Sequence, residues 1–442
     1  MNKFTEMLEE KLMPIASRVA SNKYLIAIRD GFALALPLLI IGAIHLLLAN
    51  LPITGYPAFM AGIFGPNWAT FFVIPFNATM AIMAIFVVLG IAYSLAGQFE
   101  LDQISTAVIA LVSFLIITPL NMMVTPAAGD PIAVGDVIPF TWIGSRGLFV
   151  GILTAIFATL IVRFVVRKNW VISMPDGVPP TVAKGFSALI PAVIVFTLFN
   201  LLRLLMTFTS FGTVHDMIFN VLQTPLTALG ATLPATLVAN FFIGLFWVFG
   251  IHGANIVGAV MGPIWLSLSA DNLNAFQAGQ PLPNIITQQF QELYLQLGGS
   301  GSTLSLALIM LFLTKSQLLK KLGKLAILPG LFNINEPITF GVPIVLNPLM
   351  MIPFILTPMI LAVFVYYWTA LGFVPRPSGV IIPWTTPPII GGLLMAGIPG
   401  AITQLIELVI SFFIYYPFIM AVDKQYLNQE LEAQHHEETA SV

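Results

Sequence analysis

Long apolar runs of about 20 residues dominate the pattern of this chain. A helix needs about 20 apolar residues to cross the hydrocarbon core of a bilayer, so each regular run predicts one transmembrane helix. From Gly31 to Phe99 there is no Asp, Glu, Lys or Arg, and the Pro/Gly/Asn-rich residues 51–68 divide this region in two. In the first part of the chain we expect five spans, at about residues 24–49, 71–97, 104–124, 144–166 and 183–205.

The pattern becomes irregular after about residue 230. An interfacial amphipathic helix is expected at residues 212–230. Glycine, histidine and asparagine interrupt the apolar region 233–268, which forms one or two spans, while residues 349–371 and 401–422 each predict a regular one. We therefore predict an all-α polytopic membrane protein with about eight to ten transmembrane helices, one or two re-entrant hairpins and interfacial amphipathic helices.

Two segments in this irregular part are too rich in glycine or proline for ordinary spans. Residues 298–303 read Gly-Gly-Ser-Gly-Ser-Thr between two short apolar arms. This pattern predicts a re-entrant hairpin whose tip exposes backbone N–H groups, and a plain surface turn is the alternative. Residues 381–388, with three prolines, form either a second hairpin tip or a cavity-lining loop.

Composition supports a membrane protein, since 58% of the residues are hydrophobic and only 8% are charged. Soluble domains have about 25% charged residues. The net charge of −2 gives no indication of nucleic-acid binding. The chain has no cysteine, which excludes disulfides, thiolate metal sites and a phosphocysteine of its own.

The distribution of basic residues predicts the orientation in the membrane. The N-terminal 30 residues are charged and amphipathic, which indicates an interfacial helix rather than a cleaved signal peptide. Basic residues also cluster at 163–184 and 315–324. By the positive-inside rule these regions are cytoplasmic, so we expect a multi-pass membrane protein with both termini cytoplasmic.

The peptide Asn333-Ile334-Asn335-Glu336-Pro337-Ile338 places a carboxylate and two amides in a hydrophobic field. A lone carboxylate at membrane depth costs on the order of 2.5 kcal/mol or more, so such groups usually line a site or pathway. Pro337 predicts a break, and broken backbone survives in a bilayer only when buried or facing water. We interpret the peptide as part of a substrate cavity. The alternatives are a structural carboxylate paired with helix N-terminal amides, an exposed loop residue and an ion-coupling site.

A second polar peptide contains His252, Gly253, Ala254 and Asn255, close to Trp247. In a helix, His252 and Asn255 would share a face, although a lone histidine in an apolar span is often structural. A histidine and a carboxylate in one cavity could relay protons or prepare a hydroxyl for phosphoryl transfer. The sequence has no nucleotide-binding motif, so a phosphoryl donor would be external. Trp247 and Trp384 are candidate sugar-stacking faces or interface-belt residues.

The peptide from Asn333 to Gly341, continuing to Pro348, resembles the signature of the membrane-spanning IIC component of the bacterial phosphoenolpyruvate-dependent sugar phosphotransferase system. The peptide around His252 and the glycine-rich Gly298–Gly301 fit the same family. The resemblance extends from the N-terminal helix to about residue 425. It is strongest to the lactose/cellobiose/diacetylchitobiose branch.

The resemblance implies a homodimer with an elevator-type movement. Residues 1–180 would form the interface domain, which includes the N-terminal amphipathic helix; the domain could also extend to about residue 230. Residues 231–425 would form the transport domain, and residues 426–442 an acidic tail. The partners would be a disaccharide, the lipid bilayer and a phosphocysteine IIB protein, with IIA and the general phosphocarrier upstream. No cofactor and no metal site is expected.

The resemblance also implies roles for individual residues. Glu336 and His252 would be catalytic groups near the 6-hydroxyl that the IIB protein phosphorylates. The expected substrate-binding or site-shaping residues are Asn255, Asn333, Asn335, Trp247, Trp384, Gly298, Gly299 and Ser300.

Two other functions remain open on the residues alone. The first is a proton-coupled secondary sugar transporter that uses His252 and Glu336 as its relay. The second is a passive channel or a membrane sensor, which would not need so polar a broken segment. Transfer of phosphate to imported sugar distinguishes the phosphotransferase component from both.

Overall fold

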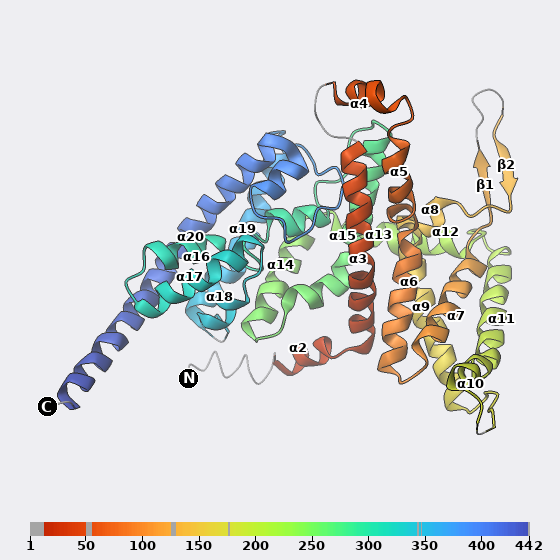
Figure 1. Ribbon diagram of the computed structural model, residues 1–442, viewed down its shortest axis with the longest axis horizontal. Coiled ribbons are helices and arrows are strands. Elements are labelled where there is room, and N and C mark those ends of the chain that lie inside the picture. The colour runs from red at the N-terminus through yellow and green to blue at the C-terminus, as the bar shows by residue number, and fades with distance from the viewer. Residues whose placement is uncertain are drawn as a thin grey trace. The chain divides into compact units, whose positions relative to one another are not determined.

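The computed structural model describes residues 13–49, 55–124, 130–175, 177–342, 344–345 and 347–440 (Figure 1). The chain divides into two compact units, one formed by residues 21–228 and the other by residues 229–442 together with the first 20. In the described part, seven helices are long and apolar enough to cross a membrane, and the bent pair at 214–230 and 233–248 adds an eighth. These helices confirm the predicted all-α polytopic fold.

The unit of residues 21–228 is a helical bundle with one small β-ribbon (Figure 1). Its elements are α3 (Lys23–Ala49), α4 (Tyr56–Phe64), α5 (Thr70–Asn77), η1 (Met80–Ile82), α6 (Met83–Gln98), α7 (Gln103–Ile117), β1 (Asn121–Val124), β2 (Ile132–Gly135), α8 (Phe140–Ile143), η2 (Ser145–Gly147), α9 (Leu148–Arg167), α10 (Pro180–Ser187), α11 (Leu189–Met206), α12 (Val214–Ile218), η3 (Phe219–Gln223) and α13 (Thr224–Gly230).

The third predicted span is shorter than expected. Helix α7 ends at Ile117 because Pro119 follows, and the residue before a proline disfavours helical angles. The chain then forms the antiparallel strands β1 and β2, with Asn121 opposite Gly135. The sequence predicted only a polar loop after this span. The apolar pattern of the residues after Ile117 is too short to distinguish a strand from the end of a helix.

The other unit contains α2 (Met13–Ala20), α14 (Leu233–Val248), α15 (Gly253–Gln277), η4 (Phe290–Tyr294), α16 (Leu304–Phe312), α17 (Gln317–Leu331), α18 (Glu336–Gly341), α19 (Pro348–Ala370) and α20 (Ile390–Ala440). The apolar region 233–268 is thus two helices, α14 and α15. Of the predicted N-terminal interfacial helix, the part before residue 13 lies outside the described residues.

Two reversals of the chain interrupt this unit. Residues 298–303 connect η4 to α16 and are all buried, so the plain surface turn is excluded. The second reversal lies inside α20, where Ala396 and Gly397 leave helical angles. Gly392 and Gly400 approach so closely there that a Cβ on either would meet the other's carbonyl oxygen.

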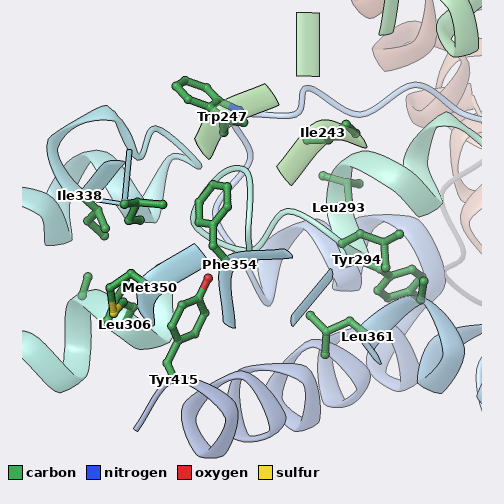
Figure 2. Packing of buried hydrophobic residues seen from close by; sticks show 14 of the residues in the cluster. Ile243, Trp247, Leu293, Tyr294, Leu306, Ile338, Met350, Phe354, Leu361 and Tyr415 are labelled. Carbon is green, nitrogen blue, oxygen red and sulfur yellow. The ribbon is translucent and has the colours of Figure 1, made fainter. Parts of the chain in front are cut away.

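A large hydrophobic core holds this unit together (Figure 2). Phe354 of α19 and Tyr415 of α20 are fully buried at its centre. Gly301 lies against the Phe354 ring, where a Cβ would collide with it. The Tyr415 hydroxyl donates to the Gly301 carbonyl oxygen at 2.6 Å. The core therefore fixes the position of the glycine-rich reversal.

Helices α3 and α6 of the first unit cross at two glycines. A Cβ on Gly90 would lie 2.8 Å from the Gly31 Cα, closer than real Cβ atoms approach. Small residues at a helix crossing allow backbones to pack directly in membranes. We expect Gly90→Ala to lower the free energy of unfolding by about 1–3 kcal/mol through overpacking. Thermal unfolding in detergent measures the effect.

The matched control is Gly62→Ala on α4, where a Cβ meets no atom within 4 Å. This variant should keep the melting temperature or raise it slightly, because alanine favours the helix. Equal melting temperatures for the Gly90 and Gly62 variants would contradict the close crossing.

Candidate functional site

Asn333 holds three segments of the chain together. Its Oδ1 accepts from the Gly298 N–H at 2.8 Å, and its Nδ2 donates to the carbonyl oxygens of Trp384 and Thr386 at 2.5 and 3.0 Å. The residue is 7% exposed and has φ of 62°, a left-handed conformation that asparagine tolerates better than most residues. The amide thus joins the glycine-rich reversal, the Asn-Glu-Pro peptide and the proline-rich loop.

Asn335 makes a second link to the same reversal. Its Nδ2 donates to the Ser300 carbonyl oxygen at 2.6 Å. Gly299, with φ of 94°, leaves room for this contact, because a Cβ there would lie 2.6 Å from the Asn335 Cγ. Gly298 and Gly299 therefore serve close backbone approach, and the Asn333 and Asn335 side chains are engaged by protein groups.

Glu336 begins the short helix α18 immediately after these anchored amides. Pro337 follows in the first turn, where its missing N–H costs nothing. The Glu336 side chain is exposed, while Ile338 and Thr339 of the same helix are buried. The two asparagines are fixed and the carboxylate between them and the proline remains accessible. This arrangement suits a group that acts on a ligand.

His252 lies at the start of α15, as its N-cap rather than inside a helix. The His252 Nδ1 accepts from the Asn255 backbone N–H at 3.3 Å, so the two residues are neighbours through this cap. Both side chains are exposed. Gly253 follows with its Cα packed against α14, where a Cβ would collide with the Ile243 carbonyl oxygen. This close contact sets the direction in which α15 begins.

Trp247 connects the histidine to the helix that carries Glu336. The Trp247 and His252 ring centroids are 4.4 Å apart, and the Trp247 and Phe340 centroids are 6.2 Å apart. Phe340 is four residues after Glu336 on α18. Trp247 itself is 2% exposed, so it serves as a packed support in this conformation (Figure 2). The sequence did not indicate that this tryptophan is buried.

Trp384 has the opposite environment. It is 44% exposed, in the loop that Asn333 binds through carbonyl oxygens 384 and 386. The backbone is therefore held while the indole face is free to contact a ligand. Among the ten predicted site residues, the structure thus gathers Asn333, Asn335, the glycine-rich reversal and Trp384 at one point. His252, with Asn255 beside it, is joined to the helix of Glu336 through Trp247.

Sequence reasoning missed a network of buried amides around η4. Asn240 and Gln291 exchange two hydrogen bonds of 2.9 Å, and Gln289 accepts from Ser269 Oγ at 3.0 Å. Gln404 Nε2 donates to the Leu293 carbonyl oxygen at 2.7 Å. Gln404 also accepts from two backbone N–H groups, those of Ile389 and Gly392. The amide-rich composition of residues 284–296 was the signal available in the sequence.

Comparison with known proteins identifies the family. The sequence matches the family described as "Phosphotransferase system, EIIC" over residues 29–358. It is 46% identical to the putative permease IIC component YwbA of Bacillus subtilis, over 97% of this chain and 98% of that one. It is 48% identical to the cellobiose-specific EIIC component of Geobacillus stearothermophilus, over 97% and 96%.

A solved structure has the same fold. The transporter ChbC, the IIC component from the N,N'-diacetylchitobiose-specific phosphotransferase system, matches with a TM-score of 0.93 and 47% identity, over 96% of this chain and 99% of that one. The match covers both compact units. With the family match over residues 29–358, it shows that this chain is a member of the EIIC family of the phosphotransferase system.

Proposed function

We propose that this protein carries a β-linked disaccharide, of the cellobiose or diacetylchitobiose type, across the membrane and presents its 6-hydroxyl for phosphorylation. The observation that carries the proposal is the exposed Glu336 carboxylate, held at a fixed point by the buried Asn333 and Asn335. The relatives whose names include cellobiose, lichenan and oligo-β-mannoside support a β-linked substrate.

The chemistry requires an external phosphoryl donor, because this chain has no cysteine. The donor is the phosphocysteine of a IIB protein. In the transfer, Glu336 accepts the proton of the sugar 6-hydroxyl, the O–P bond forms, and the S–P bond breaks to leave a thiolate on the partner. His252 orients the same hydroxyl. Phosphorylation makes the sugar an anion, and the import step becomes effectively one-way.

The larger arrangement follows the same proposal. Residues 229–442 form the transport domain, which carries the site, and residues 21–228 form the interface domain of a homodimer. An elevator-type movement of the transport domain exposes the sugar to each side in turn. The basic stretches at 163–184 and 315–324 support a cytoplasmic location for these regions and for both termini.

Glu336→Gln tests the catalytic step. The amide keeps the shape and hydrogen bonds of the side chain but cannot accept the proton. We expect phosphorylation of bound sugar by the IIB protein to fall by about 10²–10⁴-fold, while sugar affinity changes little. Mass analysis of the sugar after incubation with phosphorylated IIB protein measures the step, and Glu432→Gln, an exposed carboxylate on α20, is the control.

Two outcomes would contradict this role. Loss of sugar binding in Glu336→Gln would move the residue from catalysis to recognition. Unmodified sugar in the wild-type protein, with uptake that needs no partner protein and collapses with an uncoupler, would favour the proton-coupled transporter.

Asn333→Ala tests the clamp that holds the site. The substitution leaves the Gly298 N–H and the Trp384 and Thr386 carbonyl groups without this partner. We expect the free energy of unfolding to fall by about 1–3 kcal/mol, because the buried Gly298 N–H is left without its acceptor. Sugar affinity should fall as well, because the Asn333 side chain no longer holds the backbone of Trp384 in position. Thermal unfolding and equilibrium sugar binding measure both, with the exposed Asn428→Ala as the control.

Trp384→Ala tests whether the exposed indole contacts sugar. We expect about a tenfold loss of disaccharide affinity, equivalent to about 1.4 kcal/mol, without a change in melting temperature. Trp384→Phe should keep most of the affinity because a ring face remains. The control is Trp170→Ala, which removes another exposed tryptophan, in the other unit. Equal affinity for all variants would exclude stacking at Trp384.

A further inference from the structure

A second carboxyl group lies inside the unit of residues 229–442, away from the Asn-Glu-Pro peptide in sequence. Glu407 belongs to α20 and is 0% exposed. Neither of its carboxyl oxygens has a hydrogen-bond partner among the described residues. An uncompensated buried charge costs several kcal/mol, and Glu407 lies in a helix apolar enough to cross the membrane. The carboxyl group therefore needs a neutralising ligand.

Glu407 is part of a polar row on α20, which also contains Gln404, Ser411 and Tyr415. Spacings of three and four residues put the row on one helix face. This face is directed at the first reversal, because Gln404 donates to the Leu293 carbonyl oxygen at 2.7 Å and Tyr415 donates to the Gly301 carbonyl oxygen at 2.6 Å. The two ends of the row are thus bonded to the segment 293–301.

The middle of the row is different. Ser411 Oγ, like the Glu407 oxygens, has no hydrogen-bond partner in the described part of the chain, and Ser411 is 0% exposed. The Tyr294 hydroxyl of η4 is also buried and has no hydrogen-bond partner among the described residues. Tyr294 follows Leu293, whose carbonyl oxygen binds Gln404, and Gln404 lies three residues before Glu407 on α20. The three buried groups without partners therefore lie in the same part of the packing between η4 and α20.

No cationic side chain comes from the elements that pack on this part of α20. Helix α16 has no titratable residue, α19 contributes only Tyr366 and Tyr367, and η4 contributes Glu292 and Tyr294. The lysines of α17 follow a segment that packs near the C-terminal end of α20. There, backbone N–H groups of residues 315–318 donate to the carboxylates of Asp423 and Glu430. Asp423 is 16 residues beyond Glu407, about 24 Å along a helix.

We propose that this place is a proton-binding site. Glu407 carries a proton, and its neutral carboxyl group exchanges hydrogen bonds with the Tyr294 and Ser411 hydroxyls after small rotations of the three side chains. Binding the proton converts the carboxylate to a carboxylic acid and forms no other covalent bond. A proton suits the site because the oxygens come from one carboxyl and two hydroxyls, all of which can share it.

The site joins the first reversal to α20 beside Gln404, which also holds the second reversal through the N–H groups of Ile389 and Gly392. A neutral Glu407 lets these parts remain packed together without a buried net charge. With the elevator-type movement proposed above, on which this step rests, a neutral Glu407 also avoids the electrical work of moving a charge through the membrane field.

Infrared difference spectroscopy of the purified protein in detergent tests the proposal. The spectrum of Glu407→Gln is subtracted from that of the wild type, at neutral and mildly alkaline pH. We expect a carbonyl stretching band of a protonated carboxyl group that is present only in the wild type. Tyr294→Phe and Ser411→Ala should shift this band to higher frequency, because each removes one hydrogen bond to the acid. Glu407→Gln, a neutral mimic, should keep sugar affinity within about threefold.

Three results would overturn the proposal. Absence of a Glu407-dependent band would show that the group is ionised. An unshifted band in both hydroxyl variants would exclude the hydrogen-bonded arrangement. A sodium-dependent rise in the melting temperature of the wild type, absent in Glu407→Gln, would assign the site to a metal cation instead. The infrared and melting-temperature readouts use neither sugar nor a IIB protein, so they are independent of the proposed phosphorylation.

Discussion

Backbone polar groups in a broken membrane segment must find partners inside the protein, because hydrocarbon offers none. Asn333 meets this constraint for three segments at once, with one amide that accepts from Gly298 and donates to carbonyl oxygens of residues 384 and 386. An amide suits this role better than a carboxylate or a hydroxyl, since it both donates and accepts without carrying charge. The irregular loops near Glu336 therefore depend on a neutral side chain.

This constraint separates the polar residues of the site into two kinds. Asn333 and Asn335 are buried and bonded to protein, whereas Glu336, His252 and Trp384 are exposed. The sequence predicted Glu336 and His252 as catalytic groups and placed Asn333 and Asn335 with Trp384 among the substrate-binding or site-shaping residues. It could not separate the asparagines from Trp384, because sequence shows residue type but not whether hydrogen-bonding capacity is already used. A site of this type needs both, since exposed groups are held in position only by the buried ones.

Much of the architecture could be predicted from local patterns. Apolar run length located most of the spans, and Pro337 with the glycines of residues 298–301 located two of the breaks, because these signals act over a few residues. The reversal at Ala396 and Gly397 was not predicted, since the sequence placed the second candidate tip at residues 381–388. The amide partners could not be predicted, since Gln404 reaches Leu293 across 111 residues and Asn240 reaches Gln291 across 51. Hydrogen bonds of that kind depend on tertiary packing. The β1–β2 ribbon was missed for a different reason: four-residue strands carry too short a pattern to recognise.

Glu407, like Glu336, is a single carboxyl group in an apolar segment. The two differ in the backbone around them. Glu336 follows a break and begins a helix of six residues, so its carboxylate reaches an exposed position. Glu407 lies in the long helix α20 and is fully enclosed. Two carboxyl groups in apolar segments are thus accommodated differently: Glu336 is exposed at a break, whereas Glu407 is enclosed in helix packing, where a neutral form avoids the cost of a buried charge.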